Sequence, residues 1–207
     1  MEIVRLNQGN LVGAVRLAAD ILTRGGIVLY PTDTLYGLAV DATNRSALQK
    51  LRELKGREKK KPISVVVGDM AGIEAHAEMD SVARHFAKQH LPGALTLVLP
   101  GKEHLPEELM LNGAIGIRIP DDPFALALAR TFNKPFTATS ANRSGLPTAA
   151  HPDEIIRQFG SLMPYIDLVI DAGERTSSPG STVMAFRNGE AVILREGIIP
   201  REKLLGI

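Results

Sequence analysis

Helical segments and short apolar strands alternate along most of this chain, and that alternation limits its fold more than any other feature. Apolar residues at helical spacing predict helices at residues 11–23, 45–54, 80–91, 123–132 and 152–159. Short apolar segments predict strands at residues 27–30, 63–67, 95–99, 115–119, 136–139, 167–171 and 182–186. These elements do not form a regular βαβ repeat. We therefore expect a mixed α/β fold with one twisted, open sheet that contains parallel and antiparallel pairs.

The last predicted strand continues into a hairpin. Asn188 and Gly189 suit a two-residue turn, after which residues 192–195 would return as the partner strand. The length of 207 residues fits one hydrophobic core, so we expect a single domain over residues 1–207 with a core at about 10–200.

Composition excludes several classes of function. The chain has 24 basic and 23 acidic residues, so its net charge of +1 gives no general argument for nucleic-acid binding. It has no cysteine, which excludes disulfides, a thiolate nucleophile and cysteine-bound zinc. No secretory signal and no membrane-spanning apolar run is visible, so we expect a cytoplasmic protein with no membrane partner.

The most concentrated charge lies in residues 52–61, where six cations and two glutamates share ten positions. A charged helix end usually meets only solvent, but Gly56 and Pro62 constrain this loop. Arg57 could grip a phosphate with its planar fork, while Lys55 and Lys61 would act as exposed point charges. The sequence leaves both the solvated loop and the phosphate site open.

Polar segments follow several predicted strands. Residues 31–37 supply three hydroxyls and a carboxylate at a strand end, where open α/β sheets place ligands, although a polar turn is the common alternative. Residues 139–145 supply hydroxyls, an amide and a glycine after another strand. Residues 177–182 form a further polar loop, and Arg195 ends the hairpin.

Arg118 lies within the apolar strand 115–119, where a charge needs a partner. Asp121 or Asp122 could supply it, and so could the carboxylate of a ligand. Several familiar sites are absent from the sequence: it has no phosphate loop of the Gly-x-x-x-x-Gly-Lys type, no Gly-x-Gly-x-x-Gly and no His-Glu-x-x-His. Ser140 is a poor nucleophile candidate, because no nucleophile elbow or triad spacing accompanies it.

Taken together and in order, these segments resemble the YrdC/Sua5 family of threonylcarbamoyl-AMP synthases. The matching pieces are YPTDTLYG (30–37), KGR (55–57) with KP (61–62), LPGALT (91–96), GIRIP (116–120), TSAN (139–142) with SG (144–145), and STV (181–183). The chain resembles the short form of the family. The resemblance implies a YrdC/RibB-like fold, in which a twisted open sheet surrounds a positively lined cavity.

The resemblance also implies roles for particular residues. The family's signature tetrad matches Lys55, Arg57, Ser140 and Asn142. Its ATP-contact positions match Arg57, Ser140, Thr148 and Arg195, with Lys61 as a further phosphate cation. Its threonine-contact positions match Thr34, Arg118 and Ser181. Some members carry a histidine against threonine where this chain has Val65 and Val66, so that contact is missing here.

The implied reaction joins L-threonine, bicarbonate or CO2, and ATP into threonylcarbamoyl-adenylate and pyrophosphate, for N6-threonylcarbamoyladenosine modification of tRNA. Mg²⁺ would arrive with the nucleotide, and a downstream threonylcarbamoyl transferase would receive the product. We expect Arg118 to hold the threonine carboxylate with two hydrogen bonds. The main alternative is a module that binds tRNA or double-stranded RNA on a basic concave surface without catalysis. A second is the carbamoyl-adenylate domain of hydrogenase maturation, which normally belongs to much larger chains.

Overall fold

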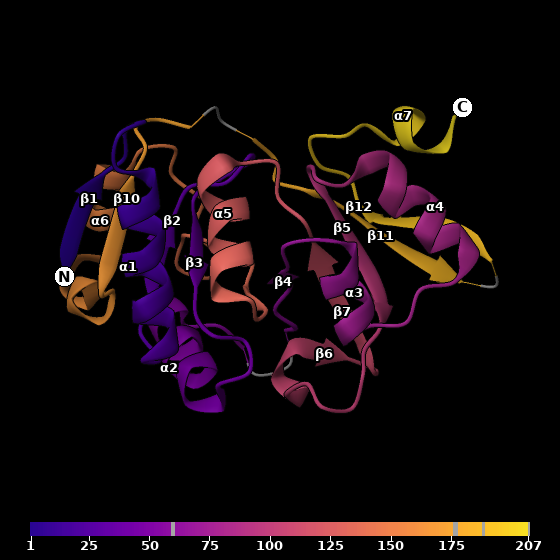
Figure 1. Ribbon diagram of the computed structural model, residues 1–207, viewed down its shortest axis with the longest axis horizontal. Coiled ribbons are helices and arrows are strands. Elements are labelled where there is room, and N and C mark those ends of the chain that lie inside the picture. Colours follow the sequence, from indigo (N-terminus) through magenta and orange to yellow (C-terminus); the bar gives the residue numbers. More distant parts are fainter. Residues whose placement is uncertain (59–60, 176–177, 188, 207) are drawn as a thin grey trace.

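The strands of this protein form two sheets rather than the single sheet expected from the sequence (Figure 1). The computed structural model describes residues 1–58, 61–175, 178–187 and 189–206. Within them, the five-stranded sheet has the order β1 (Glu2–Arg5), β10 (Leu168–Asp171), β2 (Val28–Tyr30), β3 (Gly37–Ala39) and β9 (Thr139–Ser140). β1, β10 and β2 run parallel, whereas β2, β3 and β9 pair antiparallel.

The second sheet also mixes strand directions, so the expected mixed α/β class is confirmed. Its order is β12 (Glu190–Arg195), β11 (Thr182–Arg187), β5 (Leu95–Pro100), β7 (Ala114–Arg118), β4 (Val65–Val66) and β8 (Phe136–Thr137), with β6 (Met110–Leu111) paired to β7. β5 and β11 run parallel, and β11 and β12 form the expected antiparallel hairpin. Asn188 of its predicted turn lies outside the described residues.

The expected strand at 136–139 is divided between the two sheets. Residues 136–137 form β8 and pair with β4, whereas residues 139–140 form β9 and pair with β3. Ala138 lies between them and donates its backbone N–H to Ser64 O at 2.6 Å. The chain therefore passes from one sheet to the other within five residues, and this crossing brings the polar segment after β9 next to both sheets.

All five expected helices are present. They are α1 (Leu11–Thr23), α2 (Arg45–Lys55), α4 (Ser81–His90), α5 (Pro123–Phe132) and α6 (Pro152–Phe159). The side chains of Asn44 and Asp80 accept hydrogen bonds from the first turns of α2 and α4, as good N-caps do. Two short helices, α3 (Met70–His76) and α7 (Arg201–Leu205), were not predicted, because two turns or fewer give little periodicity.

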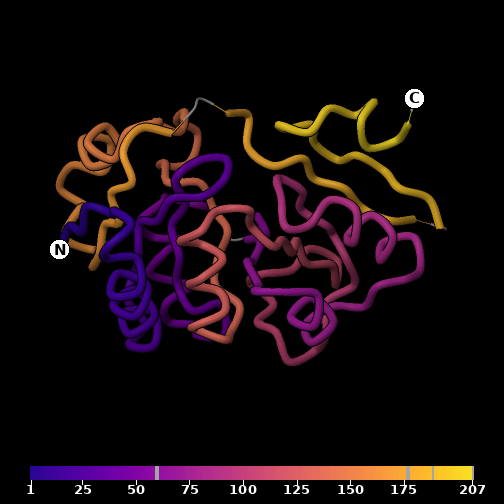
Figure 2. Tube along the Cα trace, turned by 45° about the horizontal axis from the view of Figure 1, so that its top comes forward, coloured from indigo at the N-terminus to yellow at the C-terminus, as the bar shows by residue number. Residues whose placement is uncertain are grey.

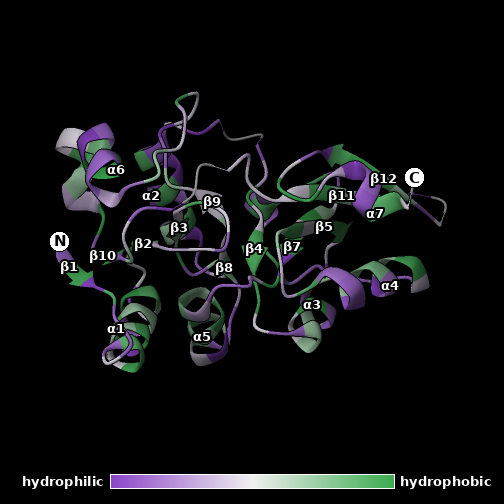
Figure 3. Cartoon of the chain, turned by 90° about the horizontal axis from the view of Figure 1, so that it is seen from above, coloured by the Kyte–Doolittle hydropathy of each residue, from purple (hydrophilic) through white to green (hydrophobic). Residues whose placement is uncertain are grey.

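The helices cover both faces of the strands (Figure 3). α1, α5, α3 and α4 lie in a row on one side, while α2 and α6 lie on the other. One buried cluster packs α1 and α5 against the five-stranded sheet, with Leu22 and Leu128 fully buried. A larger cluster joins α2 to strands of both sheets. Each fully buried leucine of this kind contributes about 1.5–3 kcal/mol to folding.

Figure 2 shows the two chain ends at opposite ends of an elongated molecule. β10 belongs to the five-stranded sheet, and β11, the next strand along the chain, belongs to the other sheet. None of the helices in the described part of the chain is long and apolar enough to cross a bilayer.

Candidate functional site

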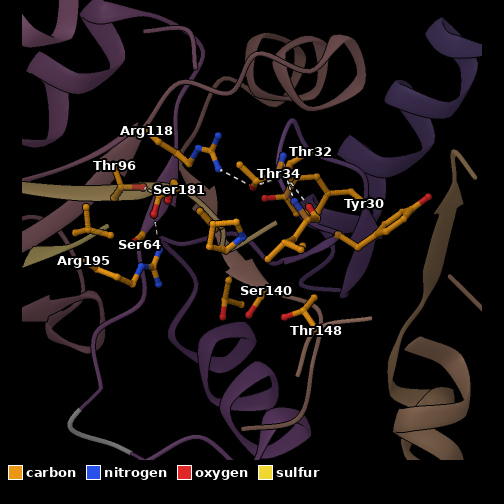
Figure 4. Close-up of a pocket in the computed structure, with 18 of the residues that line it drawn as sticks. Tyr30, Thr32, Thr34, Ser64, Thr96, Arg118, Ser140, Thr148, Ser181 and Arg195 are labelled. Atoms are coloured by element: carbon orange, nitrogen blue, oxygen red, sulfur yellow. Dashed lines mark hydrogen bonds between the residues drawn. The ribbon is translucent and has the colours of Figure 1, made fainter. Parts of the chain in front are cut away.

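Both sheets contribute side chains to one polar cavity of about 330 Å³ (Figure 4). Seven of the ten site residues predicted from the sequence line it: Thr34, Arg57, Arg118, Ser140, Thr148, Ser181 and Arg195. They come from loops and strands spread over more than 150 positions of the sequence, and the crossing at Ala138 brings them together. Lys55, Lys61 and Asn142 are not among the lining residues.

The loop after β2 places two threonines on the cavity wall. Thr32 Oγ1 accepts hydrogen bonds from the backbone N–H groups of Thr34 and Leu35 at 3.0 and 3.2 Å, so the loop is a threonine-stabilised turn. The hydroxyls of Thr32 and Thr34 lie 3.1 Å apart, and both side chains are buried. This loop is therefore the polar turn that the sequence offered as one alternative, and it also forms part of the cavity wall.

Arg118 has a partner that the sequence analysis did not identify. Its Nη2 lies 2.5 and 2.7 Å from the two carboxylate oxygens of Asp33. Asp121 and Asp122, which the sequence offered as alternatives to a ligand carboxylate, are not this partner: Asp122 instead caps α5 and pairs with Arg175 at 3.1 Å. Burial raises the pKa of Asp122, whereas the hydrogen bonds from the backbone N–H groups of Ala125 and Phe124, and the charge of Arg175, lower it.

A second group of polar side chains lies on the wall formed by the seven-stranded sheet. Thr96 Oγ1 and Ser181 Oγ are 2.8 Å apart, and Arg195 donates to the backbone oxygen of Ser181 at 2.8 Å. Burial and the nearby Arg118 lower the pKa of Arg195. Two cations that face the same hollow repel each other, and an anionic ligand between them would relieve that repulsion.

Lys55 is buried behind the cavity wall, contrary to the exposed position expected from the sequence. Only 2% of its surface is accessible, and its ammonium donates to Ser140 O, to Asn142 O at 2.8 Å and to Asn142 Oδ1 at 3.2 Å. Ser140 Oγ in turn donates to Asn142 Oδ1 at 2.6 Å. Lys55 and Asn142 therefore fix the segment that presents Ser140 to the cavity.

The basic loop, residues 52–61 of the sequence, has one part that faces the cavity and another that faces solvent. Arg57 lines the cavity and donates to Pro62 O at 2.6 Å, and burial together with Arg52 lowers its pKa. Arg52 is buried and donates to the backbone oxygens of Glu58 and Lys61, which holds the loop in place. Lys61 points to solvent and pairs with Glu58 at 3.2 Å. Lys59, Lys60 and Ser177 lie outside the described residues.

Ser64 is a lining residue that sequence reasoning missed, because it stands inside an apolar segment that predicts a strand. The available signal was Gly116 in the neighbouring strand β7. A Cβ atom at Gly116 would collide with the Ser64 hydroxyl and would lie 3.3 Å from Thr96 Cγ2. The glycine therefore keeps this side of the cavity open.

Protein stability should depend on pH through Lys55. Burial and the neighbouring Arg57 lower the pKa of Lys55 to about 7, whereas an unfolded lysine keeps its proton to about pH 10.4. Between these values the unfolded chain binds more protons, so this lysine makes the free energy of unfolding rise with pH. Urea titrations at pH 7, 8 and 9 should show a steeper rise for the wild type than for Lys55→Met. Equal slopes would contradict the lowered pKa.

The fold and this cavity define a mixed α/β protein with a polar cavity that is lined by three arginines and several hydroxyls. Residues 20–197 match the family model of the Sua5, YciO and YrdC proteins, whose description is "Telomere recombination". The chain therefore belongs to the YrdC/Sua5 family.

Three relatives illustrate the similarity. A protein of Methanocaldococcus jannaschii is 35% identical over 99% of this chain and 95% of its own length. The threonylcarbamoyl-AMP synthase of Mus musculus is 38% identical over 89% of this chain and 67% of its own. The crystal structure of Pyrococcus abyssi Sua5 complexed with L-threonine superposes with a TM-score of 0.86 at 32% identity. That match covers 99% of this chain, which spans 60% of the Pyrococcus abyssi chain.

Proposed function

We propose that this chain is a threonylcarbamoyl-AMP synthase, a nucleotidyltransferase that makes threonylcarbamoyl-adenylate and pyrophosphate from L-threonine, bicarbonate or CO2, and ATP. The observation that carries the proposal is the gathering of Arg57, Arg118 and Arg195 with threonine and serine hydroxyls in one cavity. Similarity to relatives that bear this name supports it. The product would serve the threonylcarbamoyl modification of tRNA.

Within this proposal the cavity has two ends. The ATP end uses Arg57, Ser140, Thr148 and Arg195, and the exposed Lys61 adds positive charge next to Pro62, which lines the cavity. The amino-acid end uses Thr34, Arg118 and Ser181. Lys55 and Asn142 act by holding the backbone of Ser140 in place, because their polar atoms meet that segment rather than the hollow.

The proposed reaction requires positive charge around its anionic reactants, and it does not require a nucleophile from the protein. The amine of threonine adds to the carbon of CO2 and releases a proton, which gives a carbamate. A carbamate oxygen then attacks the α-phosphorus of ATP, and the bond to the bridging oxygen breaks as pyrophosphate leaves. ATP, the carbamate and the carboxylate of threonine all carry negative charge, so the guanidinium groups of Arg57 and Arg195 would stabilise the transition state and the departing pyrophosphate.

Mg²⁺ would enter with ATP. Among the described residues that line the cavity there is no aspartate or glutamate, the ligands that magnesium sites in proteins usually provide. The lining therefore suits an ion held by the phosphate oxygens of the nucleotide. We further propose a cytoplasmic location, a single domain over residues 1–207, and delivery of the product to a separate threonylcarbamoyl transferase.

Pyrophosphate release tests the proposal. ATP and bicarbonate are supplied with threonine, with serine or with no amino acid, and pyrophosphate is measured. We expect release that depends on threonine, with serine less effective. Release without an amino acid, or none at all, would contradict the synthase. Salt-sensitive RNA binding in place of threonine-dependent release would favour the RNA-binding alternative.

Replacing Thr34 with valine should raise the KM for threonine about tenfold, because a hydrogen bond from a buried hydroxyl to a charged ligand group is worth about 1.5–3 kcal/mol. The KM for ATP should stay within about twofold, since Thr34 belongs to the amino-acid end. Thr131→Val on the outer face of α5 is the matched control. A larger change in the KM for ATP than in the KM for threonine would contradict the assignment of Thr34 to the amino-acid end.

A further inference from the structure

Asp33 stands between two residues of the cavity wall but does not itself line the cavity. Thr32 and Thr34 are lining residues, whereas the Asp33 side chain turns behind them to Arg118. The side chains of Arg118 and Asp33 are only 7% and 11% exposed, so their ion pair is shielded from solvent. A buried pair of this kind fixes geometry, because separating it would leave two uncompensated charges.

The donors of Arg118 are unequally used. Nη2 is engaged by both oxygens of Asp33 at 2.5 and 2.7 Å and by Gly93 O at 3.1 Å. Nη1 faces Thr34 Oγ1 at 3.4 Å, as Figure 4 shows. Nε is buried and has no partner among the described residues. Nε is excluded as a donor to a ligand because it is buried, and Nη2 is excluded because its hydrogens are already used. The donor that remains for a ligand is therefore Nη1, which makes only one long hydrogen bond.

This arrangement changes how a carboxylate can bind. Two parallel hydrogen bonds from a guanidinium use either both Nη atoms or Nε with Nη2, so both forms need Nη2. While Asp33 holds Nη2, a ligand carboxylate can take one hydrogen bond from Nη1, and its second oxygen must meet another donor. The Thr34 hydroxyl is next to Nη1 and lies on the cavity wall. Thr32 Oγ1 donates to Leu35 O at 2.6 Å, so the Thr34 hydroxyl donates to Thr32 Oγ1. It supplies the second bond to a carboxylate by turning this hydrogen from Thr32, whose oxygen still accepts from two backbone N–H groups.

We infer that Asp33 is a positioning residue for amino-acid recognition: through Arg118 it directs one guanidinium nitrogen, paired with the Thr34 hydroxyl, at the substrate carboxylate. This inference rests on the proposed function. It replaces the two-bond grip by Arg118 that the sequence suggested. Asp33 is not placed to take a proton from the substrate amine, because both of its oxygens face Arg118 Nη2.

The test is Asp33→Asn in the full-length protein, which keeps the size of the side chain and removes its charge. The KM for threonine should rise about tenfold or more, because loss of orientation is costly in a site of fixed geometry. The kcat and the KM for ATP should stay within about threefold. Asp41→Asn is the matched control: Asp41 is also buried and paired with a cation, Lys134, but it does not line the cavity. It should leave all three constants unchanged.

A double-mutant cycle shows whether Asp33 acts through Arg118. In an Arg118→Lys background the further loss from Asp33→Asn should shrink to less than about threefold, because coupled residues are not additive. Equal losses in both backgrounds would overturn the inference. So would a fall in kcat with a new pH dependence, which would make Asp33 a proton acceptor.

Two separate experiments distinguish an error about Asp33 from an error about the proposed function. Threonine-dependent pyrophosphate release by the wild type tests the function first. Calorimetric titration of wild type, Asp33→Asn and Asp41→Asn with L-threonine then tests Asp33 without turnover. Weaker binding in Asp33→Asn alone supports the inference, and equal binding by all three proteins overturns it.

Discussion

Replacing Arg57 with alanine is expected to lower kcat/KM for ATP about 100- to 1,000-fold, the usual loss when one preorganised donor to a developing anion is removed. Arg57 lines the cavity from the basic loop, and its backbone N–H donates to the backbone oxygen of Arg52 at 2.9 Å. Among the described residues, its guanidinium donates one hydrogen bond, to Pro62 O, which leaves other guanidinium donors for a phosphate. Steady-state pyrophosphate release at varied ATP concentration measures the effect.

Two further variants serve as controls for the Arg57→Ala experiment. Arg16→Ala removes an exposed arginine from α1 and should leave turnover unchanged. Arg57→Lys keeps the charge but loses the planar fork, and it should recover only part of the activity. Full activity of Arg57→Ala would show that this arginine does not belong to the ATP site. If circular dichroism shows that the variant is unfolded, the role of Arg57 is structural.

Replacing Gly197 with alanine is expected to destabilise the fold by about 2–4 kcal/mol, because overpacking against backbone atoms cannot be relieved by moving a side chain. A Cβ at this position would overlap Gly180 O and the carbonyl carbon of Ser181, and it would lie 2.5 Å from Thr182 N. This close approach holds the segment that carries Ser181 into the cavity. Activity should fall with stability, since the segment must move to admit the methyl group.

Gly13→Ala is the matched control, because it makes the same chemical change in a different environment. Gly13 lies on the exposed face of α1, and a Cβ there would meet nothing within 4 Å. Alanine should therefore stabilise the protein by about 0.5–1 kcal/mol through its higher helix propensity. Urea unfolding compares the two variants, and equal effects at positions 13 and 197 would contradict the packing argument.

Local signals were sufficient for most of the helices. Asn44 and Asp80 cap their helices in the structure, and Pro123 and Pro152 begin two others, as the sequence indicates. The division into two sheets was not predictable in this way. It depends on the change of partner at Ala138, which is set by pairing with β3 and β4, about 70 to 100 residues earlier in the chain.

Long-range contacts also decided where the sequence analysis of the site failed. The partner of Arg118 is Asp33, 85 positions away, rather than an aspartate close to it in sequence. Lys55 seemed to belong to an exposed charged loop, but α2 presents it to the carbonyls of Ser140 and Asn142. Residue type identified both side chains as important, whereas only the fold could show which atoms they meet.

The central claim is that one cavity brings ATP and threonine together, and product labelling tests it most directly. Purified protein is incubated with ATP, ¹³C-bicarbonate and ¹⁵N-threonine, and the nucleotides are analysed at once by mass spectrometry. We expect the wild type to form an adenylate that carries both labels, and we expect this product to be nearly absent with Arg57→Ala. Unlabelled AMP as the sole product, or equal labelling by both proteins, would contradict it.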